Sequence, residues 1–74
     1  MNIDSYTNLA NAIIEEAVKD YLKVLKRIKT NPYDDKANKE QIEIESFFMS
    51  SWFEVLTDLN PVLLIKELKS SIEK

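Results

Sequence analysis

Hydrophobic residues recur at intervals of three and four between residues 10 and 28, the spacing that places side chains on one face of an α-helix. One such row consists of Ala10, Ile14, Ala17, Tyr21, Val24 and Ile28, and an adjoining row of Ile13, Val18, Leu22 and Leu25. Acidic residues lie toward the start of this segment and basic residues toward its end, which complements the helix dipole. The pattern predicts a long amphipathic helix over residues 5–29.

Two Asn-Pro pairs, Asn31-Pro32 and Asn60-Pro61, interrupt the helical pattern. Proline disfavours the α conformation of the residue before it and lacks an amide proton, so each pair ends one helix and can open the next. We therefore predict a second helix over 35–57, with Asp34 or Asp35 as its N-cap, and a third over 61–73. No stretch alternates with a period of two, so the expected fold is an all-α three-helix bundle forming a single domain over residues 1–74.

The segment 47–53 contains all three phenylalanines and the only tryptophan of the chain. On one continuous helix these side chains would point in nearly every direction, and a helix that is apolar all round must be covered all round. One interpretation places Phe48 and Trp52 in the core between the other helices. The other is a subunit or partner interface, because aromatic residues and Met are enriched there. The candidate interface residues are Phe47, Met49, Trp52 and Phe53.

The small size of the chain favours self-association. A core of fewer than about 70–80 residues rarely supplies more than ~3–5 kcal/mol unless disulfides, metals or oligomerisation add to it. The chain has 74 residues and neither Cys nor His. The first helix, at ~37 Å, also exceeds the ~30 Å diameter of a compact chain of this length. We therefore expect a homo-oligomer.

Several kinds of chemistry are excluded by residues that the chain lacks. Without Gly there is no phosphate-binding loop of the P-loop or dinucleotide-binding kind, and without His no imidazole activates a Ser or Thr hydroxyl. We expect no catalytic residues, no metal, no cofactor and no enzymatic activity. Residues 1–7 lack the features of a signal peptide, and the longest apolar run, 62–65, is too short to span a bilayer, which predicts a cytoplasmic protein without membrane association.

A basic strip lies on the first predicted helix and consists of Lys19, Lys23, Lys26 and Arg27. Such a strip could contact phosphate groups or a partner protein. It could equally be a solvated face that is balanced by the neighbouring acidic residues. The formal net charge of −3 argues against general nucleic-acid binding, which normally needs a basic footprint.

Three features of the chain resemble one family of small proteins. They are the sequence AIIEEAVKDY at 12–21, the Asn31-Pro32 turn, and IESFFMSSWF at 44–53, followed by Leu56-Thr57 and Leu64-Ile65. Together they resemble small helical accessory proteins of phages and prophages of Gram-positive bacteria. The resemblance implies a phage protein in a bacterial host cell that acts stoichiometrically on a host factor, including components of antiviral defence.

Three functions remain open at this stage. The first is an oligomeric interaction protein that binds and blocks a host protein, with the aromatic segment building the assembly and charged helix faces meeting the target. The second is an oligomeric sponge for a phosphorylated signal such as a cyclic nucleotide, held by the basic strip with Tyr21 or Tyr33 stacking on a base. The third, a DNA-binding regulator, is disfavoured because neither turn has the short, Gly-containing form and the last helix is not basic.

Overall fold

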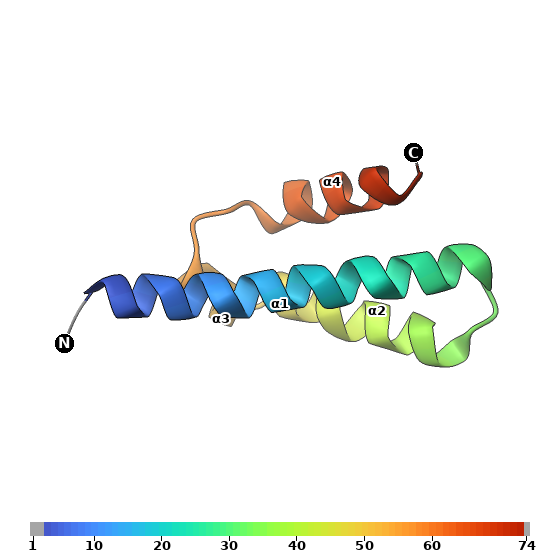
Figure 1. Ribbon diagram of the computed structural model, residues 1–74, viewed down its shortest axis with the longest axis horizontal. Helices are drawn as coiled ribbons and strands as arrows, with labels where there is room; N and C mark the ends of the chain where they lie inside the picture. Colours follow the sequence, from blue (N-terminus) through green and yellow to red (C-terminus); the bar gives the residue numbers. More distant parts are fainter. Residues whose placement is uncertain (1–2, 74) are drawn as a thin grey trace.

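The computed structural model describes residues 3–73, and the side chains of residues 10–73. The described chain forms four helices: α1 (Ile3–Thr30), α2 (Asp35–Phe48), α3 (Ser51–Leu56) and α4 (Pro61–Glu73). Helix α1 runs along the length of the molecule, α2 returns beside its C-terminal half, and α4 packs along another side of α1, where it also contacts α2 (Figure 1). The all-α expectation is confirmed. The three-helix expectation is wrong, because the predicted second helix is broken into α2 and α3.

The break lies at Met49 and Ser50. Ser50 has an extended backbone, and its hydroxyl accepts a hydrogen bond from the Phe53 amide at 3.3 Å, as an N-cap does. The same hydroxyl donates to the Phe47 carbonyl at 2.6 Å. Ser50 therefore satisfies backbone groups of both helices, and the resulting bend directs Phe48 and Phe53 into one core. The sequence does not reveal the break because no Gly or Pro marks it and Ser occurs both at caps and within helices.

We expect Ser50→Ala to destabilise the protein by about 1 kcal/mol, the usual cost of removing an N-cap hydroxyl. Urea unfolding followed by circular dichroism, at one fixed chain concentration, measures this loss. The matched control is Ser46→Ala, at an exposed position within α2, where the expected change is within about 0.5 kcal/mol. Equal unfolding midpoints for the two variants would show that the cap contributes nothing.

The first Asn-Pro pair follows the end of α1 and the second opens α4, so each pair marks a helix boundary. Asn60 accepts hydrogen bonds from the amides of Val62 (2.9 Å) and Leu63 (3.3 Å), so α4 begins at Pro61 with Asn60 as its cap. The first pair lies in the turn between α1 and α2. There Asp34 caps α2 by accepting from the Ala37 amide at 3.0 Å, and this bond, with the nearby Arg27 charge, holds the pKa of Asp34 below its ordinary value.

The molecule is elongated, with extents of 46 × 23 × 17 Å and a radius of gyration of 13.5 Å. A compact chain of this length would have a radius of gyration of about 11 Å. The buried cluster lies between α1, α2 and α3, whereas α4 has no fully buried residue and rests on the cluster through partly buried side chains. These side chains are Leu64, Ile65, Leu68 and Ile72. One bundle therefore does not enclose all of its apolar surface.

Candidate functional site

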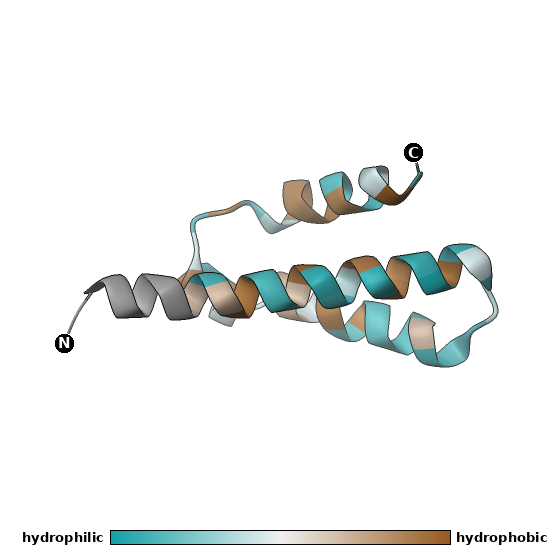
Figure 2. Ribbon diagram, viewed as in Figure 1, coloured by the Kyte–Doolittle hydropathy of each residue, from teal (hydrophilic) through white to brown (hydrophobic). Residues whose placement is uncertain are grey.

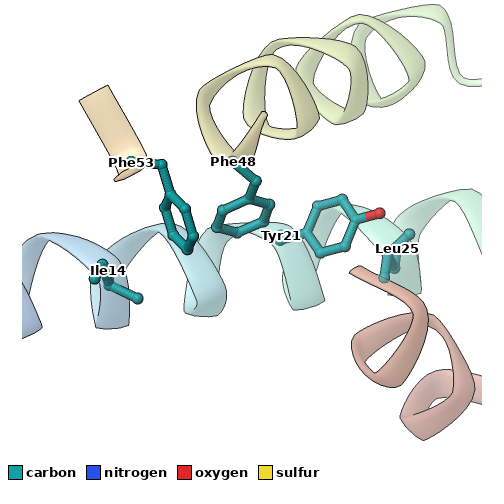
Figure 3. Close-up of a cluster of buried hydrophobic side chains, with 5 residues drawn as sticks. All are labelled: Ile14, Tyr21, Leu25, Phe48 and Phe53. Carbon is teal, nitrogen blue, oxygen red and sulfur yellow. The ribbon is translucent and has the colours of Figure 1, made fainter. Parts of the chain in front are cut away.

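The core is built around three aromatic rings that lie in a row between Ile14 and Leu25 (Figure 3). The Phe48 ring makes edge contacts with Tyr21 and Phe53, with ring centroids 5.6 Å apart in both pairs. All three side chains are fully buried. Phe48 thus lies in the core, as one of the two interpretations of the aromatic segment predicts. Phe53, expected at an interface, lies in the core of its own chain because the break at Ser50 turns it inward.

The remaining residues of the aromatic segment have different environments. Phe47 is half-buried, with its ring 5.9 Å from that of Phe53. Met49 and Trp52 are 57% and 59% exposed, and Val55, three positions after Trp52 on α3, is 78% exposed. Trp52 therefore does not belong to the core of this chain. We call Met49, Trp52 and Val55 the α3 surface. Trp52 and Val55 lie on α3 and Met49 lies just before it, and all three side chains are mostly exposed.

Further exposed apolar residues follow in the connection to α4, where brown and teal segments alternate in Figure 2, and in the first turn of α4. They are Leu59, Val62 and Leu63. Elsewhere in the described side chains, Tyr33 and Ile42 are the other large hydrophobic residues that are mostly exposed. The exposed apolar area is therefore concentrated between residues 49 and 63.

A groove of about 520 Å³ lies beside α1, where α2 ends before covering this part of the helix. Its apolar wall consists of Ala12, Ile13, Ala17 and Phe47, and Glu16 and Asp20 complete the lining. A second cavity, of about 320 Å³, lies between α1, α2 and α4. It is lined by Leu25, Ile28 and Ile72 together with Lys29, Gln41, Lys69 and Glu73. Both are open to solvent and combine apolar walls with charges.

The basic strip is partly neutralised within the chain. Arg27, the only arginine, contacts Asp34 at 3.1 Å and Glu40 at 3.6 Å, and Lys19 lies 3.8 Å from Glu15. The exposed Lys23 and Lys26 form no ion pair with any other residue that the structure describes. The structure therefore divides the strip into two engaged cations and two lysines available to another molecule.

One carboxylate that the sequence did not single out joins three helices. Glu45 on α2 accepts hydrogen bonds from the Tyr21 hydroxyl (2.6 Å) and the Gln41 amide (2.9 Å), and Lys69 of α4 lies 3.5 Å from the same oxygen. Burial alone raises the pKa of Glu45, but these three partners outweigh it and hold the pKa below its ordinary value. Burial and the neighbouring carboxylate raise the pKa of Tyr21, so its hydroxyl remains a donor.

This network is a structural link between α1, α2 and α4, and two of its members, Gln41 and Lys69, also line the second cavity. One sequence signal does identify Glu45: it precedes Phe48 by three positions and so shares its inward face. Glu40 and Glu43 belong to the same charged run, and periodicity alone did not separate them from Glu45.

Within the described residues, no group of three or more acidic side chains is arranged to hold a metal ion, and no helix is both long and apolar enough to cross a membrane. A scan against protein-family models, a search of curated proteins and a search of solved structures all found no match to this chain.

Proposed function

We propose that this chain is a non-catalytic interaction protein that assembles with copies of itself and binds and blocks a protein of a bacterial host cell. The observation that carries the proposal is the α3 surface: an exposed Trp, with an exposed Met three positions before it and an exposed Val three positions after it. Trp is among the residue types that contribute most to binding energy at protein interfaces. The resemblance to small phage and prophage proteins supports a host factor, such as a component of antiviral defence, as the target.

The charged outer face of α1 is the surface that meets the target. Lys23 and Lys26 are exposed, lie three positions apart and have no ion-pair partner among the described residues. Complementary charges at an interface accelerate association and select the partner. The proposed target therefore presents an acidic surface to these two lysines.

A charge-reversal experiment tests this part of the proposal. Tagged wild-type protein is expected to retain one host protein from bacterial lysate in a stoichiometric amount, and the purified pair to re-form with loss of the target's activity. Lys23→Glu/Lys26→Glu should weaken the affinity of the purified pair roughly tenfold or more, about 1.4 kcal/mol, and raised salt should weaken wild-type binding.

The matched control is Lys36→Glu/Lys39→Glu, which changes the net charge equally at two exposed positions of α2. This control should bind the target as the wild type does, and circular dichroism should show the same helix content in all variants. Equal weakening by both double variants would assign the effect to net charge. Absence of any stoichiometric, inhibited partner would overturn the proposed function.

The nucleotide-sequestering alternative has less support. Bidentate phosphate recognition uses the paired donors of a guanidinium group, and the only arginine of the chain already contacts Asp34 and Glu40. The aromatic rings offered for base stacking are also divided, because Tyr21 is buried in the core and Tyr33 is exposed on the α1–α2 turn.

A further inference from the structure

The chain exposes more surface than a compact monomer of its mass. Its accessible surface is 5643 Å² for 8.6 kDa, whereas a compact monomer of this size exposes ~4,700 Å². The difference is ~900 Å², close to the ~800 Å² that each partner contributes to a protein–protein interface of standard size. The excess is therefore about what one subunit contributes to a dimer.

The α3 surface is the part of the chain best suited to supply this interface. It combines a 59% exposed Trp with a 57% exposed Met and a 78% exposed Val, and Glu54 is the only charged residue on α3. Burying this surface would remove a large apolar area from water and desolvate few charges. Leu59, in the following connection, extends the exposed apolar residues beyond α3.

The groove beside α1 is less suited to a second copy. Glu16 and Asp20 line it next to Ile13 and Ala17, so a symmetric contact there would bring four carboxylates together across the interface. Like charges placed opposite one another cost free energy. Tyr33 and Ile42, two further exposed hydrophobic residues, lie on the α1–α2 turn and on α2, whereas Val62 and Leu63 follow Leu59 in the first turn of α4.

We infer that a second copy of this chain covers the α3 surface, forming a two-fold symmetric dimer in which Trp52 is buried between the subunits. In a two-fold contact each subunit uses the same patch, which closes the assembly at two copies. The inference rests on the self-assembly included in the proposed function and names the surface that produces it. The outer face of α1, with Lys23 and Lys26, takes no part in this contact and remains available to the target.

The first test uses the single tryptophan of the chain, whose fluorescence reports only this site. Light scattering and native mass spectrometry at micromolar concentration should give twice the mass of one chain. On dilution, the Trp52 emission should shift to longer wavelength over the concentration range in which the mass falls to that of a monomer. An emission maximum that stays constant while the mass changes would overturn the assignment of Trp52 to the interface.

The second test is mutational. Trp52→Glu and Val55→Glu should each raise the dimer dissociation constant roughly thirtyfold or more, as substitutions at interface hot spots do. Val55→Glu retains the tryptophan, so its emission should be that of an exposed indole at every concentration. The matched control is Ile42→Glu, the same kind of apolar-to-acidic change at a 65% exposed position of α2. It should leave the dimer intact.

Failure of this inference is distinguishable from failure of the proposed function. A wild-type monomer at all concentrations, or a wild-type assembly larger than a dimer, would overturn the two-fold dimer. A dimer that survives both α3 substitutions, or that Ile42→Glu dissociates equally well, would overturn the choice of surface. In each case capture of the host protein, and its sensitivity to the Lys23 and Lys26 substitutions, is measured separately.

Discussion

Phe48→Ala is expected to leave the chain largely unfolded at room temperature. Phe48 is fully buried, and its ring lies between those of Tyr21 and Phe53 at the centre of the core. Replacing a buried Phe with Ala costs about 3–5 kcal/mol, because transfer free energy is lost and a cavity remains. A domain of this size has a total stability of about the same magnitude. Far-UV circular dichroism should therefore show most of the helical signal lost without denaturant.

Phe47→Ala is the matched control for this prediction. Phe47 is the preceding residue and the same amino acid, but it is half-buried and lines the open groove beside α1. It should lose less stability than Phe48→Ala and remain folded, with a lower urea midpoint than the wild type at the same chain concentration. If the two variants unfolded alike, the core would not be centred on Phe48.

The features that the sequence predicted correctly depend on local physical rules. The first helix was expected over 5–29 and spans Ile3–Thr30. Hydrophobic residues that recur at intervals of three and four over so many positions are typical of an α-helix. The start of α4 at Pro61 follows from the fixed backbone angle of proline and the capping side chain of Asn60. Each of these signals depends on residues within one helical turn of each other. They therefore predict the helices without reference to tertiary packing.

The features that the sequence did not predict depend on tertiary packing. Ser50 could continue a helix or cap a new one, and the choice is decided by whether Phe48 and Phe53 then reach the same core. That choice in turn decides that Trp52, next to Phe53, faces solvent. The engagement of Arg27 by Asp34 and Glu40 likewise depends on how the α1–α2 turn folds back. Helical periodicity contains no information on either point.

Glu45→Ala is expected to destabilise the protein by about 1–3 kcal/mol, the cost of leaving a buried hydroxyl without its acceptor. The hydroxyl is that of Tyr21, whose side chain is fully buried and donates to Glu45 at 2.6 Å. The same change removes the ion pair with Lys69 and so loosens α4. Urea unfolding gives the overall loss, and hydrogen exchange should show faster exchange in α4 than in the wild type.

The matched control for this variant is a double-mutant cycle with Tyr21→Phe. Removing both partners leaves no buried hydroxyl without an acceptor, so Tyr21→Phe/Glu45→Ala should be less destabilised than the sum of the two single variants. Additive losses would show that the hydrogen bond between Tyr21 and Glu45 contributes no coupling energy.

The Glu45 network also makes stability depend on pH in two opposite ranges. The pKa of Glu45 is lower in the folded chain than in the unfolded one, so its contribution is complete above its ordinary pKa of about 4.3 and is lost as pH falls through the lowered value. The pKa of Tyr21 is raised, so its contribution is complete below about pH 10 and is lost as pH rises further.

The difference in unfolding free energy between wild type and Glu45→Gln isolates the acidic range. Gln does not titrate, and the other carboxylates, including Asp34, are common to both proteins. This difference should be constant near neutral pH and shrink in acid. A difference that stays constant into strong acid would mean that the folded chain does not stabilise the charged form of Glu45.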